Sequence, residues 1–438
     1  MSATDQAAKA EAQPLSASYV NGALWLLLVI YTLNFLDRQI VNILAEPIKK
    51  DLALSDTQLG LLTGLAFAVV YTVLGIPIAR YADRFSANRV QVISVALAVW
   101  SGFTALCGLA SNFTQLLLAR IGVGIGEAGC TPAAHSLIVD YVDPARRARA
   151  LAFYSLGVPI GTLLGYSFGG VVAEHLGWKS AFLLVGAPGL LLAVVTWFVM
   201  KEPRRLGLVS PPAVDHKPLG FSEALKILAG RKSYWYACLG ASVISFLGYG
   251  HAAFLGGFYA RVHEMPIGQI GIALGMVLGL SGIVGTFIGG QIADRAARKD
   301  TRAYFTVPAI AMLCSVPFFV AGMLADTALH SLLLLSIPTA LNSLWYGPIY
   351  AVVQGVAGPQ LRATAVAIML FIVNMIGLGL GPLALGVLSD HLATTQGLGA
   401  AEGLRWALLL SASIGLVTVL LFLLGRQTIR ADIAAANS

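Results

Sequence analysis

Long apolar blocks, each about 20 to 25 residues in length, follow one another along almost the whole chain. A helix of that length crosses a hydrocarbon layer about 30 Å thick. Backbone amides inside lipid need partners within their own segment, so the blocks predict helices, and the short alternating strands of a membrane barrel are absent from the pattern. Because only 11% of the residues are charged, against about 25% in soluble domains, the sequence predicts an all-helical integral membrane protein.

The blocks predict twelve membrane spans in two sets of six. The first set covers 22–44, 58–80, 90–110, 114–139, 148–173 and 181–200, and the second covers 234–262, 268–292, 304–325, 329–354, 363–389 and 405–425. A long polar stretch separates the two sets, and within it 221–228 has the apolar spacing of a helix on a membrane surface. The predicted divisions are therefore a tail (1–21), a bundle (22–200), a linker (201–233), a second bundle (234–425) and a C-terminal tail (426–438).

Lysine and arginine residues are distributed unevenly between the predicted loops. Positive residues accumulate on the cytoplasmic side of a membrane. With the N-terminus inside, most of the 28 lysines and arginines fall in cytoplasmic segments, and the opposite side holds Lys49, Lys50, Lys179, Arg261 and Arg405. We therefore expect a multi-pass protein of the cell inner membrane with both termini and the linker in the cytoplasm. The first residues lack a cleavable signal peptide, so the first span is expected to direct insertion.

Several function classes are disfavoured by the residue patterns. The net charge of +7 does not predict a nucleic-acid partner, because the positive residues lie between spans and not on one soluble face. The four cysteines lie in apolar blocks, where they indicate packing and not a disulfide or metal site. His135 and Asp140 match the H-x4-D pattern of acyltransferases, but without a soluble catalytic domain, and no hydrolase or phosphate-binding motif is present. We expect no enzyme activity, no cofactor and no metal.

The two sets of spans repeat one another. Ala82-Asp83-Arg84 follows the second span, and Ala293-Asp294-Arg295 follows the eighth. The pattern P-x-x-R-A-x-A opens the fifth span at Pro144 and the eleventh at Pro359, and the E/D-H-L triplets at 174–176 and 390–392 come near the ends of the same spans. Matches in the same order predict two six-helix bundles related by a pseudo-two-fold axis along the membrane normal, with a central site between them.

The repeated Asp-Arg pairs resemble the loop signature G-x-x-x-D-R-x-x-R of the major facilitator superfamily, although Ala79 replaces the glycine in the first copy. In that family the signature residues bridge helices on the cytoplasmic side and hold the outward-facing state. The resemblance implies that Arg84 or Arg89 pairs with Asp140 and that Asp83 faces the start of the eleventh helix. The full set of gating residues that it implies is Asp83, Arg84, Arg89, Asp140, Asp294, Arg295 and Arg298.

Two further stretches narrow the resemblance. Asn34-Phe-Leu-Asp37-Arg38 in the first span, and the Gly-rich run from Arg120 to Glu127 in the fourth, look like the spinster branch of the superfamily. Its eukaryotic members are associated with export of sphingosine phosphates and lysophospholipids, and its bacterial members are thought to be proton-coupled. The lean loops and short tails resemble the bacterial members. The resemblance implies a secondary active transporter that works by alternating access.

Three ionisable residues lie inside the predicted spans. Placing each of them in the membrane interior costs about 2.5 to 3.5 kcal/mol, so their presence needs an explanation. Asp37 and Arg120 are predicted at a similar depth, and Glu127 lies two turns from Arg120 on the same helix face. Asp37, Arg120 and Glu127 could thus form a proton-coupling group in which Asp37 pairs with Arg120, or a fixed ion pair that only joins helices. Arg38 points about 100° away from Asp37 and is assigned to packing or an outer gate. The glycines at 122, 124, 126 and 129 indicate close helix packing.

Polar residues of the second half are predicted at mid-membrane level, and either ligand contact or internal bonding would explain them. Together with Arg120 and Asn34, the candidate substrate-binding residues are Tyr249, His251, Asn342, Tyr346, Tyr350 and Asn374. They suggest a cavity with aromatic walls opposite a charged first half, and Arg120 is the expected anchor for an anion. The predicted partners are a small amphipathic or anionic substrate such as a lysolipid, protons and membrane lipids. A carrier of small organic anions or drugs is the alternative, and the expected oligomeric state is a monomer.

Overall fold

The computed structural model describes residues 15–209, 221–358 and 360–437, and within these ranges every regular element is a helix. Eleven of the helices described are long and apolar enough to cross a membrane. The predicted fourth span, 114–139, is not among them, and the structure divides it into α6 (Phe113–Glu127) and α7 (Cys130–Tyr141). The two pieces together occupy the place of that span.

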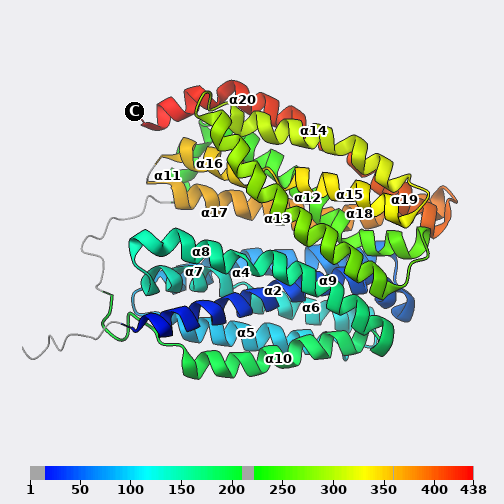
Figure 1. Cartoon of the computed structure of the whole chain (residues 1–438), viewed down its shortest axis with the longest axis horizontal. Coiled ribbons are helices and arrows are strands. Elements are labelled where there is room, and N and C mark those ends of the chain that lie inside the picture. The colour runs from blue at the N-terminus through cyan, green and yellow to red at the C-terminus, as the bar shows by residue number, and fades with distance from the viewer. Residues whose placement is uncertain (1–14, 210–220, 359, 438) are drawn as a thin grey trace, which may run out of the picture.

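The first half, shown in blue to green in Figure 1, contains the elements up to residue 199. They are α2 (Ala17–Leu52), α3 (Asp56–Gly60), the π-helical turn η1 (Leu61–Leu65), α4 (Ala66–Asp83), α5 (Arg89–Cys107), α6, α7, the 3-10 turn η2 (Pro144–Arg146), α8 (Arg147–Ser155), α9 (Gly157–Leu176) and α10 (Trp178–Val199). The helix α2 begins five residues before the predicted span and continues through Pro47 to Leu52.

The second half, green to red in Figure 1, begins after the linker helix α11 (Phe221–Ala229). Its elements are α12 (Lys232–Val262), α13 (Ile267–Ala297), α14 (Ala303–Met323), α15 (Ala328–Asn342), α16 (Tyr346–Ala357), α17 (Arg362–Val373), the π-helix η3 (Asn374–Leu380), α18 (Gly381–Asp390), the π-helical turn η4 (His391–Thr395), α19 (Gly399–Ala412) and α20 (Gly415–Asn437). The segment 426–437, predicted as a tail, continues the last helix. There Asp432 accepts hydrogen bonds from the Ser233 backbone and hydroxyl.

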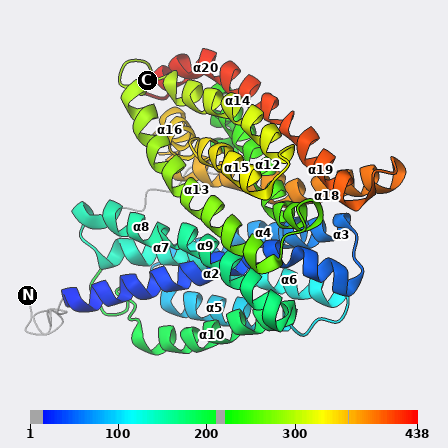
Figure 2. The same ribbon diagram turned by 45° about the vertical axis from the view of Figure 1, so that its right-hand side comes forward.

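The two halves meet along α2, η1, α4 and α9 on one side and α12, α13, η3 and α18 on the other. Figures 1 and 2 show α13 crossing from the second half to lie beside α9 of the first. Small residues allow this approach, because a Cβ on Gly271 would lie 2.4 Å from the Tyr166 carbonyl oxygen. The glycines at 157, 161, 165 and 169 on another face of α9 pack against α2 within the first half.

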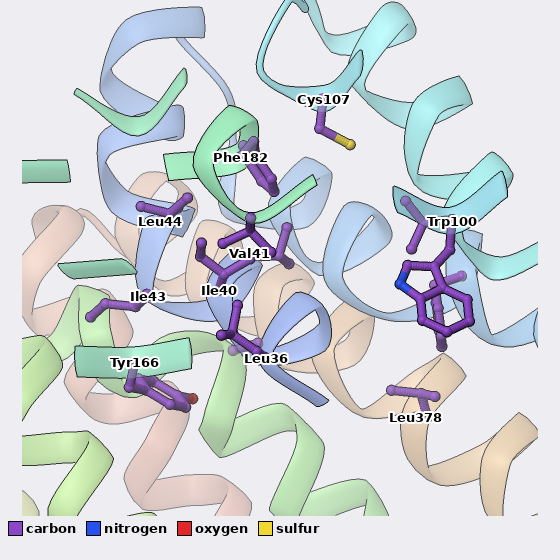
Figure 3. Close-up of a cluster of buried hydrophobic side chains, with 14 of the residues drawn as sticks. Leu36, Ile40, Val41, Ile43, Leu44, Trp100, Cys107, Tyr166, Phe182 and Leu378 are labelled. Atoms are coloured by element: carbon purple, nitrogen blue, oxygen red, sulfur yellow. The ribbon is translucent and has the colours of Figure 1, made fainter. Parts of the chain in front are cut away.

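The helix α2 passes through the centre of the first half. Figure 3 shows Leu36, Ile40 and Val41 of this helix among side chains from its neighbours, including Tyr166 of α9 and Phe182 of α10. Ile40, Tyr166 and Phe182 are fully buried. The same helix carries Asn34, Asp37 and Arg38, so its apolar packing fixes where the charged groups lie.

The break between α6 and α7 falls at Ala128 and Gly129, directly after Glu127. The glycines before it pack α6 closely on its neighbours: a Cβ on Gly122 would overlap the Phe103 ring, and one on Gly126 would lie 2.4 Å from the Trp100 backbone nitrogen. The expected close packing is therefore present. Glycine in a helix interior costs about 1 kcal/mol relative to alanine, so a run of glycines makes this span easier to interrupt.

Candidate functional site

The central ion pair joins α2 to the end of α6. Arg38 Nε lies 2.5 Å from Glu127 Oε2, and the Glu127 side chain is fully buried. The guanidinium lies over three aromatic rings, with distances to the ring centroids of 5.3 Å for Phe35, 5.0 Å for Phe67 and 4.4 Å for Tyr71. Cation–π attraction and the carboxylate together compensate a charge held away from water.

Asp37 and Arg120, expected to pair in one state of the transport cycle, are not paired in this conformation. Asp37 forms no ion pair with any described residue, and its Oδ1 is buried without a hydrogen-bond partner. The polar groups near Asp37 include Glu127 and Arg120 as well as Thr104 and Trp100. Adjacent helix residues point about 100° apart, so only one of Asp37 and Arg38 could face Glu127, and the depth argument did not determine which. Arg38, assigned to packing or an outer gate from the sequence, is the residue that does.

Arg120 lies on α6 two turns before Glu127 and forms no ion pair within the described ranges. It is 2% exposed, its Nε lacks a hydrogen-bond partner, and its guanidinium lies 5.4 Å from the Phe67 ring centroid. Asn34, beside Glu127, is fully buried with both side-chain polar atoms unpaired. The centre of the molecule therefore holds a cationic group and an amide with hydrogen-bonding capacity to spare.

A small cavity of about 30 Å³ lies at this place between the halves. Its lining comes from both: Phe35, Arg38, Gln39, Asn42, Thr63, Phe67 and Arg120 from the first, and Tyr249, Leu378 and Pro382 from the second. Two guanidinium groups, amides and aromatic rings thus face one space. The two guanidinium groups could hold an anionic group by charge-assisted hydrogen bonds.

The predicted residues of the second half occupy different places. Tyr249 lines the cavity, and Tyr346 and Tyr350 lie within electrostatic range of Tyr249. His251 packs inside the second half, where its Nε2 lies 2.9 Å from Ser411 Oγ and its ring stacks on Phe319.

Two asparagines of the predicted set also lie outside the cavity lining. Asn342, at the end of α15, has a buried carbonyl oxygen without a partner, and Asn374 begins η3. Among the predicted residues of the second half, the cavity lining therefore includes Tyr249 alone. Tyr346 and Tyr350 lie near Tyr249 but, like His251, Asn342 and Asn374, are not lining residues.

The predicted gating residues lie at one end of the molecule, here called the Asp83 end. Arg89 is buried and pairs with Asp140 at 2.6 Å and with Glu202. Arg204 also reaches Asp140, and it donates to the Arg84 carbonyl at 3.0 Å. All of these residues belong to the first half or its following segment. The sequence analysis placed Glu202 and Arg204 only in the linker. Their position directly after the sixth span was the signal that could have indicated their part in this network.

The other predicted gating residues at the Asp83 end are exposed. Asp83, Arg84, Asp294, Arg295 and Arg298 form no ion pair with described residues, and Asp294 receives a 3.5 Å contact from the Tyr304 hydroxyl. Within the described ranges, no hydrogen bond or ion pair joins the two halves at this end.

The opposite end, here called the Asp56 end, holds a charged network between the halves that the sequence analysis missed. Arg261 at the end of α12 reaches Glu46 of α2 at 2.7 Å and Asp56 of α3 at 2.8 Å. Asp390 accepts hydrogen bonds from the backbones of Asp56 and Thr57 at 3.0 and 2.7 Å. In the sequence, the signal for this network was the presence of opposite charges near the ends of predicted spans.

Further contacts close the Asp56 end. Lys49 lies 2.5 Å from Asp56, and the Ser389 hydroxyl donates to Asp56 at 2.6 Å. Glu174 of α9 accepts from the Gly268 backbone of α13 at 2.6 Å. The side chains of Glu46, Asp56 and Arg261 are each less than 10% exposed. The Ser389 and Gly268 contacts cross between the halves at this end, whereas Lys49 supports Asp56 from within the first half.

The chain matches the family model described as the Major Facilitator Superfamily over residues 27–382. It belongs to that superfamily. An MFS-type efflux pump of Mycolicibacterium smegmatis is 35% identical over 411 residues, which cover 94% of each chain. The protein spinster homolog 1 of Xenopus laevis is 28% identical over 91% of this chain and 80% of its own length.

A solved structure of a bacterial homolog of the human lysosomal transporter Spinster, in an inward-facing and unoccupied conformation, is similar throughout. It matches with a TM-score of 0.88 and 32% identity over 95% of this chain and 99% of that one. These findings confirm the resemblance to spinster-type transporters of bacteria and the all-helical membrane fold. The chain is therefore a multi-pass membrane transporter of the superfamily, which is a family of transporters and not of enzymes.

Proposed function

We propose that this protein is a proton-coupled secondary transporter that moves an amphipathic anion of lysolipid type by alternating access. The observation that carries the proposal is the cavity in which Arg120, which forms no ion pair with any described residue, lies beside the buried Arg38–Glu127 pair. Buried charges are costly in a membrane protein and usually mark the path of a substrate or a proton. The relatives named as spinster homologs and as an efflux pump are compatible with this use.

The coupling step is a change in the contact between Arg38 and Glu127. A buried carboxylate binds a proton more readily when a neighbouring guanidinium moves away, and loses it when the guanidinium approaches. Protonation of Glu127 would free Arg38 to join Arg120 in binding the anionic group of the substrate. Asp37 is the second proton site of the group, since its carboxylate is buried beside Thr104 with one oxygen unpaired. Protonation of Glu127 would thus strengthen anion binding, and anion binding would favour protonation of Glu127.

The substrate is an anion with an apolar portion. Two guanidinium groups can hold a phosphate or carboxylate, while Phe35, Phe67 and Tyr249 provide aromatic surface in the same cavity. A carrier of small organic anions or drugs is the second candidate, and the specific observation in its favour is the 35% identity to an efflux pump. We further propose that the protein acts as a monomer in the inner membrane, with both termini, the linker and the Asp83 end on the cytoplasmic side.

Transport by the purified protein in liposomes tests the proposal. Under an imposed pH gradient, the wild type should accumulate a labelled lysolipid anion, whereas Glu127→Gln should lose proton-driven accumulation but keep downhill exchange. Arg120→Ala should lose substrate binding itself. His251→Gln is the matched control, because this buried polar residue lies outside the cavity lining. Accumulation by Glu127→Gln at the wild-type level would refute Glu127 as the coupling site, and uptake of organic acids but not lysolipids would favour the second candidate.

A further inference from the structure

A second hollow lies on the lipid-facing side of the first half, where α4, α5 and α6 meet. Its volume is about 370 Å³, and it shares no lining residue with the central cavity. Val95 of α5 and Ile125 of α6, on two of its walls, are 53% and 41% exposed. The groove is therefore open toward the hydrocarbon of the membrane and not toward the transport path.

The groove is polar at one end and apolar along the rest. Its wall on α5 runs from Asn88 to Val99, which is about 16 Å of helix. That length is close to half of the about 30 Å hydrocarbon thickness, or the depth of one leaflet. Tyr81, Asn88 and Gln91 line the end nearest Arg84, and valine and isoleucine side chains line the deeper part.

Positive charge surrounds the polar end. Arg80 and Arg84, on the same helix end as Tyr81, are exposed and form no ion pair with described residues. One exposed carboxylate, Asp83, lies between them in the sequence. Basic residues at the edge of a membrane span attract anionic lipid headgroups at about 1 kcal/mol each. The side of the groove that meets the headgroup region thus complements a negative charge.

We propose that this groove binds one acyl chain of an anionic phospholipid from the leaflet nearer the Asp83 end, with the phosphate beside Arg80 and Arg84. The groove is also lined by Gly126, just before the break after Glu127, and by Gly129 within the break. A chain in the groove fills the space against that break from the lipid side. The bound lipid is then a packing element for the span that carries the coupling carboxylate.

Native mass spectrometry of the full-length protein can measure the retained lipid directly. The wild-type protein is mixed in detergent with phosphatidylglycerol or with phosphatidylcholine that has the same acyl chains. The detergent is then removed in the mass spectrometer. We expect one phosphatidylglycerol to remain bound and phosphatidylcholine to dissociate. Val95→Trp and Ile125→Trp fill the groove from opposite walls and should each lower phosphatidylglycerol retention by about tenfold or more, because a blocked chain loses its apolar contacts. Arg80→Gln should lower retention without filling the groove.

Val194→Trp is the matched control, since Val194 is 56% exposed on α10 and is not part of the groove. This variant should retain phosphatidylglycerol as the wild type does, and the elution profile of each variant shows whether it is folded. Equal retention of the two lipids would refute the charge complementarity. Unchanged phosphatidylglycerol retention in both folded groove variants would refute the groove as the binding site. The proposed transport function does not depend on that result.

Discussion

The two ends of the molecule differ in how the halves meet. At the Asp56 end, Arg261 and Asp390 of the second half make buried, charge-assisted contacts with Glu46, Asp56 and Thr57 of the first. At the Asp83 end, the buried network around Arg89 remains inside the first half, and the repeated Asp-Arg pairs are exposed. The similar structure with the TM-score of 0.88 is inward-facing and unoccupied. The contrast shows that contacts across the halves, and not charge alone, determine which end is closed.

The largest expected effect comes from removing the cation that joins the halves. Arg261→Ala leaves Glu46 and Asp56 buried without their shared partner, a change worth about 3–5 kcal/mol for a buried pair. We expect spin-label distances across the Asp56 end to lengthen and those across the Asp83 end to shorten.

Arg405→Ala is the control for that experiment, because Arg405 pairs with Glu402 within one helix of the second half. An exposed pair of that kind contributes about 0–1 kcal/mol, so its loss should leave both sets of distances unchanged. Unchanged distances in Arg261→Ala as well would mean that the charged network does not hold this end closed.

Backbone packing between the halves gives the next effect. A Cβ on Gly386 would lie 2.2 Å from the Asp56 carbonyl oxygen, and one on Gly60 would lie 2.3 Å from the Pro382 carbonyl oxygen. Gly386→Ala and Gly60→Ala should therefore open the Asp56 end, with an overpacking cost of about 1–3 kcal/mol in the closed form.

The control for backbone packing is Gly290→Ala, where a Cβ would meet no atom within 4 Å. Cysteine accessibility at the Asp56 end measures the opening. Rates of labelling that match in Gly60→Ala, Gly386→Ala and Gly290→Ala would show that the close contacts yield without separating the halves.

A smaller effect is expected at the Asp83 end. Asp83→Asn removes an exposed charge that forms no ion pair with described residues, so thermal stability of this state should stay the same. If Asp83 latches this end when it closes, the substitution should favour the open form by about 1 kcal/mol, the size of a weak coupling energy. Spin labels across the Asp83 end report the shift, and distances that match the wild type under turnover conditions would remove Asp83 from the gate.

The smallest effect concerns the exposed pair of Asp300 and Arg430, also at the Asp83 end but within the second half. The backbone N–H of Arg302 and the Arg430 side chain hold the pKa of Asp300 below its usual value. A lowered folded-state pKa stabilises the protein above the ordinary aspartate range, and that contribution is lost as pH falls through the folded pKa. Asp300→Asn should cause only a slight, acid-sensitive change in melting temperature, and a shift in the gating distances would contradict its assignment to one half.

The sequence by itself determined the class of fold. Apolar block length and the demand for internal backbone hydrogen bonds leave helices as the default way to cross a membrane, and the repeated Asp-Arg pairs indicated two related halves. The glycines before Glu127 correctly indicated close helix packing, since small side chains have that effect in any membrane helix pair. The proposed roles of Asp37, Arg120 and Glu127 in coupling stay predictions.

Only the tertiary structure decided which charges meet. Helix rotation determined that Arg38, and not Asp37, faces Glu127, because neighbouring residues differ by about 100° around the axis. The network of Arg261 with Glu46 and Asp56 joins residues more than 200 positions apart, and no local pattern encodes such a contact. The sequence supplies the charged groups and their depth, but the packing of α2 against the neighbouring helices sets the direction in which each side chain points.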